Sequence, residues 1–192
     1  IIMSAIVSIL TGVFAVSCGT VRAGYETAPF KTIKQEGNFE LREYPPLVLA
    51  KTPMQGADGS FRRLFRFISG QNSEQKKIAM TTPVFFEGEA TNAAMSFVMP
   101  AGMTPTNAPK PNDNSVSLQQ ADGGRFAVLR FRGGRNAQNE AQALQQLQDW
   151  MKKEKLTASG GPVYAYFDPP WTPGIFRRNE VMLRVNPPPP AD

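Results

Sequence analysis

The chain has 192 residues, of which 41% are hydrophobic and 19% are charged, and its net charge is +5. This length and balance predict one globular domain and exclude a disordered protein, and the scattered basic residues give no reason to expect nucleic-acid binding. Histidine is absent, which excludes the catalytic triads and dyads that need it, histidine-containing zinc sites and a histidine ligand to iron.

The first 23 residues have features of a secretory signal. Residues 1–17 carry no charge, and this apolar run is short for a membrane span but suits a signal peptide. In one interpretation it is a bacterial lipoprotein signal, in which Cys18, the only cysteine, is lipidated and anchors the protein to the membrane. In a second, an ordinary signal is cleaved after Ala23, and in a third the run remains as an apolar anchor. The first two place the domain outside the cytoplasm, on the periplasmic side of a bacterial membrane or secreted.

We place the folded domain at residues 24–186. The sequence of its first half predicts two strands, a helix and two more strands. Ser60–Gly70 predicts the helix, with Ser60 as its N-cap and Gly70 at its end. Residues at helical spacing form an apolar stripe that we expect to be buried, namely Phe61, Leu64, Phe65 and Ile68. The four predicted strands are Phe39–Tyr44, Leu47–Thr52, Met80–Phe86 and Met95–Met99.

The second half repeats this order. The helix is predicted from about Ala137 to Lys155, where lysines near the end suit the negative end of the helix dipole. Its apolar stripe consists of Ala141, Leu144, Leu147 and Met151. A turn at residues 122–124 separates the first two of its four strands. These strands are Ser115–Leu118, Phe126–Arg132, Val163–Phe167 and Val181–Val185.

The order strand-strand-helix-strand-strand occurs once in each half and predicts an α+β fold. We expect a curved antiparallel sheet or distorted β-barrel, flanked by the two helices. Residues 100–111, with four prolines, predict a loop that crosses between the halves. The prolines at 187–190 predict an extended tail outside the core.

Four segments carry a resemblance to a known family. They are Lys77-Ile-Ala-Met-Thr-Thr-Pro-Val84, the helix at Ser60–Gly70, Tyr166-Phe-Asp-Pro-Pro-Trp-Thr-Pro173 and Arg177-Arg-Asn-Glu-Val181. In this order and spacing they closely resemble the SOUL family of heme-binding proteins, from about residue 25 to 185. The resemblance implies a shallow hydrophobic groove for heme beside the first helix and the loop at residues 168–178. We expect a monomer.

The side chains of these segments suggest how such a groove holds its ligand. The first helix carries three arginines on its polar face, and a guanidinium can bind a propionate through two parallel hydrogen bonds. A solvated basic face is the alternative. Trp171 either offers a broad apolar face or fills the core beneath its loop, and the run containing Met80 is alternatively a core strand behind the first helix. The candidate cofactor-binding residues are Arg62, Arg63, Phe65, Arg66, Met80, Trp171, Arg177 and Arg178.

Ligation of iron is where the chain departs from what some relatives are thought to use, since it has no histidine. The remaining possible donors are Met54, Met80, Met99, Tyr44 and Tyr164. Methionine alone is a weak ligand and usually fills gaps in cores. We therefore expect apolar contact and propionate pairing to dominate, with weak or absent ligation, so that an iron-free porphyrin binds about as well.

The leading functional interpretation is a non-enzymatic carrier or buffer of heme or a related tetrapyrrole outside the cytoplasm. The alternative is an interaction module whose groove binds a protein or a lipid. An enzyme is not expected, because no pair of carboxylates is spaced as an acid/base couple, and no protein metal site is expected. The two halves also resemble the ligand domains of bacterial multidrug regulators, but the chain has no helix-turn-helix segment.

Overall fold

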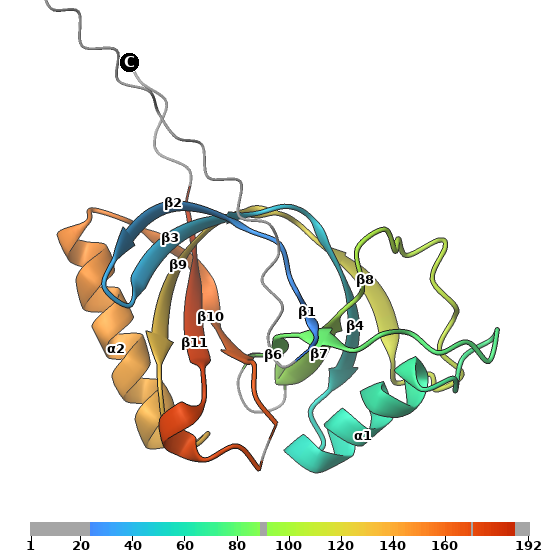
Figure 1. Ribbon diagram of the computed structural model, residues 1–192. Coiled ribbons are helices and arrows are strands. Elements are labelled where there is room, and N and C mark those ends of the chain that lie inside the picture. Colours follow the sequence, from blue (N-terminus) through green and yellow to red (C-terminus); the bar gives the residue numbers. More distant parts are fainter. Residues whose placement is uncertain (1–23, 89–91, 170, 187–192) are drawn as a thin grey trace, which may run out of the picture.

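The computed structural model describes residues 24–88, 92–169 and 171–186 of the chain. The predictions made for the signal segment at 1–23, including Cys18, and for the tail at 187–192 lie outside these residues. Within the described part, one large curved sheet forms the body of the molecule, and a helix lies at each side of it (Figure 1). The predicted α+β fold is confirmed.

Nine strands of the described residues form this sheet, and all of their pairings are antiparallel. Two short strands, β1 (Glu26–Thr27) and β5 (Thr81–Thr82), pair separately in parallel. The sheet is open, with β2 and β8 at its edges, so it is curved but not a closed barrel. Its strands are β2 (Lys31–Glu36), β3 (Phe39–Tyr44), β4 (Leu47–Pro53), β6 (Val84–Glu87), β7 (Ala94–Val98), β8 (Ser117–Ala121), β9 (Gly124–Phe131), β10 (Ala158–Tyr166) and β11 (Asn179–Val185).

The sheet is made of two similar sets of strands. The sets are β3-β9-β11-β10 and β6-β7-β4-β8, and they meet where β10 pairs with β6. The outer strand of each set comes from the other half of the sequence. In this arrangement β3 precedes the first helix but pairs with β9, whereas β8 pairs back with β4. The predicted repeat is present, and its two halves exchange their first strands.

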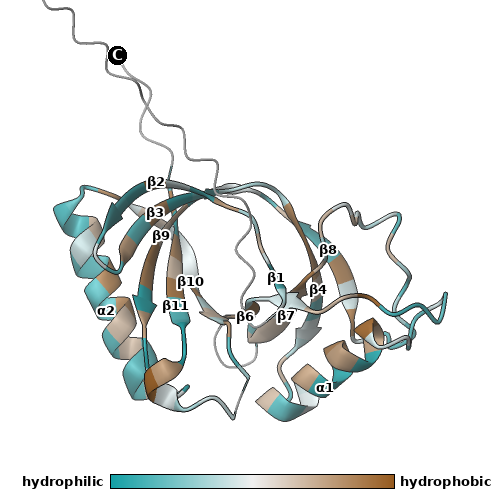
Figure 2. Cartoon of the chain, viewed as in Figure 1, coloured by the Kyte–Doolittle hydropathy of each residue, from teal (hydrophilic) through white to brown (hydrophobic). Residues whose placement is uncertain are grey.

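The two helices pack on the same face of the sheet. The first, α1 (Ala57–Ile68), lies on β4 and β7, and the second, α2 (Ala137–Lys153), lies on β9 and β11. Both helices are amphipathic, with hydrophobic and hydrophilic residues alternating along α1 most clearly (Figure 2). The other face of the sheet is concave and holds a separate core around Tyr44, Phe85 and Met182. No helix of the described residues is long and apolar enough to cross a membrane.

The buried side of α1 differs from the predicted stripe. Leu64 and Ile68 are buried as expected, but Phe61 and Phe65 are 39% and 48% exposed, and Phe67 takes their place in the core. The predicted N-cap is also wrong, because the helix begins before Ser60. The buried Ser60 hydroxyl instead accepts a hydrogen bond from the Gln55 backbone (2.9 Å) and donates one to the Pro53 carbonyl (3.2 Å). Gly70 does follow the helix end, with a positive φ of 115° that favours glycine.

Helix α2 shows a similar rotation of its buried face. Leu147 and Met151 are buried as predicted, but Ala141 is exposed, and Ala143 and Trp150 complete the buried side. The Trp150 ring stacks on Phe39 at 5.4 Å, and its N–H donates to Glu36 at 3.1 Å. This contact attaches the edge strand β2 to α2.

Candidate functional site

The two helices pack on different strands and leave a strip of the sheet between them. α1 covers β4 and β7, and α2 covers β9 and β11, whereas β10 and β6 lie side by side between these pairs. On these two strands the inward residues Phe85 and Ala165 are buried. The outward residues are partly exposed, and all are apolar or aromatic: Val84, Phe86, Tyr164 and Tyr166. This strip is therefore an apolar surface that a ligand can reach.

Two rings and one arginine form the centre of the strip. The Phe86 and Tyr166 rings meet edge to face at 5.2 Å, and the Arg135 guanidinium lies 3.8 Å over the Phe86 ring. The Tyr166 hydroxyl donates a hydrogen bond to the Glu140 carboxylate, which also pairs with Arg135 at 3.7 Å. Burial and the bond to Glu140 raise the pKa of Tyr166 well above its ordinary value, so the phenol stays neutral.

Helix α1 adds two further rings. Phe61 and Phe65 stack on each other at 5.9 Å, and Phe61 meets the edge of Phe97 at 5.2 Å. Phe97 is the cross-strand partner of Val84, so the pair on α1 lies beside the outer face of β6. Phe61 and Phe65 are not in the core, and because they are exposed they are available for binding. We refer to Phe61, Phe65, Phe86 and Tyr166 as the aromatic surface.

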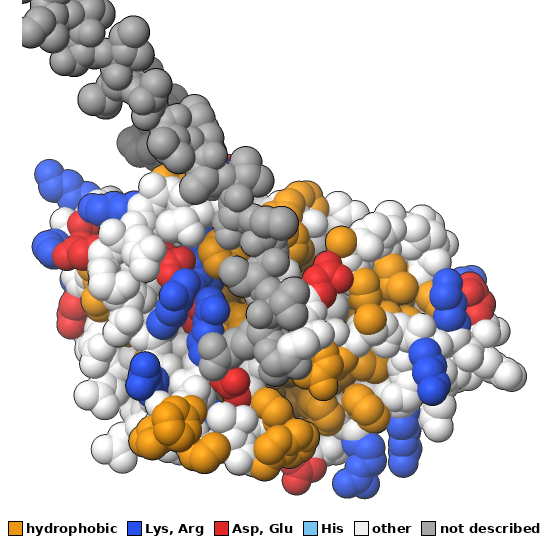
Figure 3. Space-filling view, in the orientation of Figure 1, with side chains coloured by type: hydrophobic (Ala, Val, Ile, Leu, Met, Phe, Trp, Pro, Cys, Tyr) orange, Lys and Arg blue, Asp and Glu red, His pale blue; other side chains and the backbone are white. Residues whose placement is uncertain are grey.

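The loop between β10 and β11 presents three more apolar side chains to solvent. Trp171, Ile175 and Phe176 are 82%, 66% and 65% exposed, and the last two belong to the short helix η2 (Gly174–Phe176). Trp171 is therefore not a core plug. Figure 3 shows apolar side chains gathered along the lower edge of the molecule, where η2 and the start of α1 lie in Figure 1. A hydrogen bond from the Gly133 N–H to the Gly174 carbonyl (3.0 Å) connects this loop to the segment that carries Arg135.

The three candidate arginines of α1 have different surroundings. Arg62 and Arg66 are exposed. Arg63 is largely buried, and it donates to the Thr52 hydroxyl at 2.7 Å and to the Gln55 amide oxygen at 2.6 Å. Arg62 and Arg66 can thus approach a ligand acid directly, whereas Arg63 already connects α1 to β4 and the residues after it.

The two candidate arginines of the late loop are also engaged. The Arg177 side chain donates to the Thr172 carbonyl at 2.7 Å. Arg178 lies 4.3 Å over the Phe167 ring and donates twice to the Glu180 carboxylate, at 2.6 and 2.9 Å. These contacts fix the shape of the loop, and a direct role for either arginine in ligand binding stays a prediction.

Glu180 belongs to a buried ionic network on the concave face that sequence reasoning missed. Arg42, with no exposed surface, donates twice to Glu180 (2.7 and 3.0 Å) and once to Glu40 (2.7 Å). Burial opposes the charge on Glu180, but Arg42 and Arg178 outweigh it and hold its pKa below the ordinary value. Burial raises the pKa of Tyr44, which accepts a hydrogen bond from Arg42, to about 12. Glu180 is thus charged, and both carboxylates form ion pairs with Arg42.

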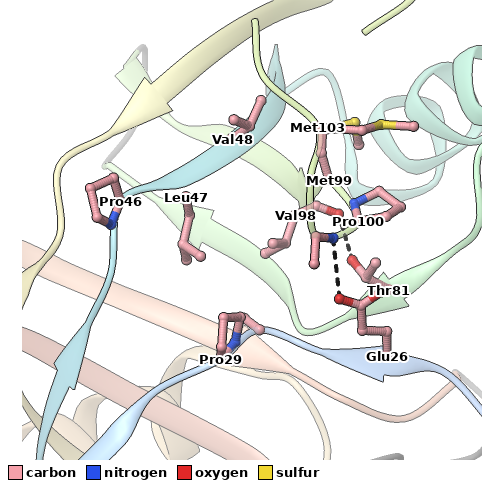
Figure 4. A pocket seen from close by; sticks show the side chains of 13 residues that line it. Glu26, Pro29, Pro46, Leu47, Val48, Thr81, Val98, Met99, Pro100 and Met103 are labelled. Carbon is pink, nitrogen blue, oxygen red and sulfur yellow. Dashed lines mark hydrogen bonds between the residues drawn. The ribbon is translucent and has the colours of Figure 1, made fainter. Parts of the chain in front are cut away.

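Two cavities in the described part of the structure are each about 210 Å³. One lies on the concave face beside Tyr44 and Phe85. The other lies between β1, β4 and the end of β7, where Glu26 accepts from the Ala101 N–H (3.2 Å) and Thr81 donates to the Val98 carbonyl (2.5 Å; Figure 4). Ligand pockets usually measure roughly 300–1,000 Å³. Neither cavity is large enough for a tetrapyrrole, so the aromatic surface is the better candidate.

The run at 77–84 contributes mainly to packing. Ile78, Thr81 and Thr82 are buried, and Met80 packs partly buried against the core beneath α1. The Thr82 hydroxyl lies 3.2 Å from that of Thr27 on β1. The run therefore packs behind the first helix as that interpretation has it, but it is not one strand, since only Thr81, Thr82 and Val84 lie in strands. Val84, at its end, lies on the outer strip.

Of the residues at this site, the sequence predicted Phe65, Arg62, Arg66 and the late loop. It did not predict Phe86, Tyr166 and Arg135 as site residues. Phe86 was assigned only to a strand, and Tyr166 to a strand and to the start of one family segment. The available signal was their alternation with the buried residues Phe85 and Ala165. That alternation shows two faces, but it does not show that no helix covers the outer one.

Comparison with solved structures shows the same fold in other proteins. The C-terminal domain of EcmrR has a TM-score of 0.56 at 13% identity, over 77% of this chain and 96% of that one. An uncharacterised conserved protein from Listeria innocua has a TM-score of 0.57 at 13% identity, over 79% and 94% of the chains. A protein described as a hydrolase from Listeria innocua has a TM-score of 0.56 at 11% identity, over 80% and 94%. At these identities the likeness concerns the fold alone.

Comparison of sequences is more specific. No match was found among curated proteins. The family described as SOUL heme-binding protein, however, matches residues 25–184, which include both helices, the run at 77–84 and the late loop. This match spans most of the chain and agrees with the four segments that carried the resemblance. The chain therefore belongs to the SOUL heme-binding protein family.

Proposed function

We propose that this protein binds heme or a related tetrapyrrole, without a covalent link, on the aromatic surface. The observation that carries the proposal is the set of exposed rings on α1 and partly exposed rings on β6 and β10. The exposed Arg62 and Arg66 lie on the same helix as the first pair. A flat macrocycle buries apolar area by stacking on such rings, and its propionates then bind guanidinium groups at the solvent edge. Family membership supports the same class of ligand.

The residues present fit the macrocycle and its acids better than its iron. The chain has no histidine, and no group of three or more histidine, cysteine, aspartate or glutamate side chains in the described ranges could hold a metal ion. The Tyr166 phenol is neutral and bonded to Glu140. Heme would supply an iron centre when bound. The part of this chain is to hold the ring, pair with its acids and restrict water on one side.

A carrier or buffer outside the cytoplasm is the role that we assign to this site. The fully buried carboxylates Glu40 and Glu180 are both paired with arginines, and Glu140 is engaged by Tyr166 and Arg135. Carboxylates held in this way are poorly placed for the proton transfers of an enzyme. The extracytoplasmic location rests on the apolar segment at residues 1–17.

Titration of hemin, followed by its Soret absorption, tests the site. Changing Arg62 and Arg66 together to glutamine should weaken binding about tenfold or more, because a charge-assisted hydrogen bond contributes about 1.5–3 kcal/mol. Arg125→Gln, an exposed arginine on β9, is the matched control and should leave the affinity unchanged. Equal affinity of all variants would show that α1 does not pair with the propionates.

Protoporphyrin without iron tests the role of the metal. Its affinity should be within about tenfold of that of hemin, because the chain has no histidine that could ligate the iron. Tighter binding of hemin by about a thousandfold would mean that a side chain ligates iron. Met80, which is partly buried against the core beneath α1, would then be the first residue to replace.

A further inference from the structure

The three apolar side chains of the late loop form a projecting tip. Trp171, Ile175 and Phe176 are the most exposed large hydrophobic residues of the described chain. They lie within six positions of one another, around η2. We refer to these three residues as the apolar tip. Exposed apolar side chains gathered in one patch often mark a surface that binds a protein or a membrane.

Several backbone groups beneath the tip are already hydrogen-bonded within the protein. The N–H groups of Thr172, Phe176 and Arg177 donate to the carbonyls of Pro169, Pro173 and Gly174 at 2.9–3.1 Å. Further carbonyls of the loop accept bonds from side chains, since Thr172 is bonded by Arg177 (2.7 Å) and Ile175 by Arg132 (3.4 Å). These polar groups are satisfied before anything binds. The tip can therefore enter an apolar medium without exposing them to it.

The surface next to the tip carries two arginines, and one of them is paired with a carboxylate. Arg132 and Arg135 are exposed and flank Gly133, the residue whose N–H bonds the carbonyl of Gly174 in η2. Glu140 pairs with Arg135 at 3.7 Å and accepts from Tyr166, and Asp168 accepts from the Arg178 backbone N–H at 2.6 Å. An apolar projection with tryptophan and surrounding arginines suits the boundary between lipid headgroups and acyl chains. The exposed Arg132 and the net charge of +5 of the chain favour anionic lipids.

We propose that the apolar tip inserts into the surface of an anionic lipid bilayer and docks the domain there. The tip is carried by the late loop, whereas the rings and arginines proposed to hold a tetrapyrrole lie on α1, β6 and β10. Docking therefore does not depend on heme binding, although a docked protein would present its ligand surface close to the membrane. Contact is at the level of the interface, because the tip is a single turn of chain.

Tryptophan fluorescence of the full chain tests this insertion directly. The sequence has two tryptophans, and Trp150 is 5% exposed whereas Trp171 is 82% exposed. In a Trp150→Phe variant, emission reports Trp171 alone. Vesicles of phosphatidylcholine with phosphatidylglycerol should shift this emission to the blue, and lipids brominated on the acyl chain should quench it. Pure phosphatidylcholine vesicles and added salt should weaken both effects.

Matched variants connect the signal to the tip. In the Trp150→Phe background, Ile175→Ser with Phe176→Ser should weaken vesicle binding about tenfold or more, because both side chains lose their burial in lipid. Ile33→Ser removes another exposed apolar residue (42%), on the edge strand β2, and should have no effect. Arg132→Gln should reduce binding to anionic vesicles only. The readout follows Trp171 itself, so any membrane affinity of residues 1–23 does not imitate it.

Three results would overturn the proposal. The Trp171 emission could remain unchanged with anionic vesicles, or it could change equally in the Ile175/Phe176 variant. The protein could also sediment as a dimer that the same variant dissociates, with no response to lipid, which would make the tip an interface between copies. Hemin titration of these variants separates the two proposals, because loss of docking with normal hemin affinity concerns the tip alone.

Discussion

At the scale of single residues, neighbouring arginines of identical chemistry have different roles. Arg62 and Arg63 are adjacent in the sequence, yet Arg62 lies in solvent whereas Arg63 bonds Thr52 and Gln55. Sequence placed both on one polar helical face. What it could not supply was the position of β4, whose Thr52 hydroxyl is buried and meets the guanidinium.

Replacement of each arginine by alanine should separate these roles. Arg63→Ala should lower the free energy of unfolding by about 1.5–3 kcal/mol, since it leaves the buried Thr52 hydroxyl without this donor. Arg62→Ala should change it by less than about 0.5 kcal/mol. Denaturant melts of the two variants measure the difference. Equal losses would contradict the contacts seen for Arg63.

At the scale of elements, the helices were predictable but their buried faces were only partly so. The spacing of Phe61, Leu64, Phe65 and Ile68 fits one helical face, and so does that of Leu64, Phe67 and Ile68. The helix has five large apolar residues in twelve positions, and these are enough to form either face. The sheet decides between them, because β4 and β7 contact the side that contains Phe67.

Truncation of two neighbouring side chains tests this assignment. Leu64 has no exposed surface, so Leu64→Ala should cost about 2–5 kcal/mol of unfolding free energy, as expected for a cavity in a core. Phe65 is half exposed and packs on Phe61, so Phe65→Ala should cost less than about 1.5 kcal/mol. The same Phe65 variant should weaken hemin binding. A loss of unfolding free energy as large as that of Leu64→Ala would indicate that Phe65 is buried in the core.

At the scale of the whole molecule, the ionic network on the concave face connects strands that are distant in sequence. Arg42 on β3 and Glu180 on β11 are 138 positions apart. No local pattern indicates such a pair, which explains why the strand repeat was predicted and the network was not. The edge strand β2 was missed for another reason, since all six of its residues are exposed and give no buried alternation.

The network predicts a pH dependence of stability. The pKa of Glu180 is lower in the folded than in the unfolded chain, so its charge stabilises the fold fully above the unfolded value of about 4.3. This stabilisation is lost as the pH falls from there through the folded pKa. Glu180→Gln should cost about 3–5 kcal/mol near neutral pH, because it leaves Arg42 buried with less compensation.

Urea unfolding at a series of pH values measures both effects. The parent protein should lose stability steeply below about pH 4, and Glu180→Gln should lose less over the same interval. Parallel curves would mean that Glu180 does not carry the acid sensitivity.

The exchange of first strands between the two halves has a consequence for synthesis. While the ribosome has released only the first half, β3 pairs with β2 but lacks β9, and β4 lacks β8. The nascent chain therefore cannot complete either set of strands until the second half has emerged. Two fragments cut between β7 and β8 should each fail to form a complete sheet alone. They should form the native sheet only when they are mixed, because each fragment supplies a strand that the other lacks.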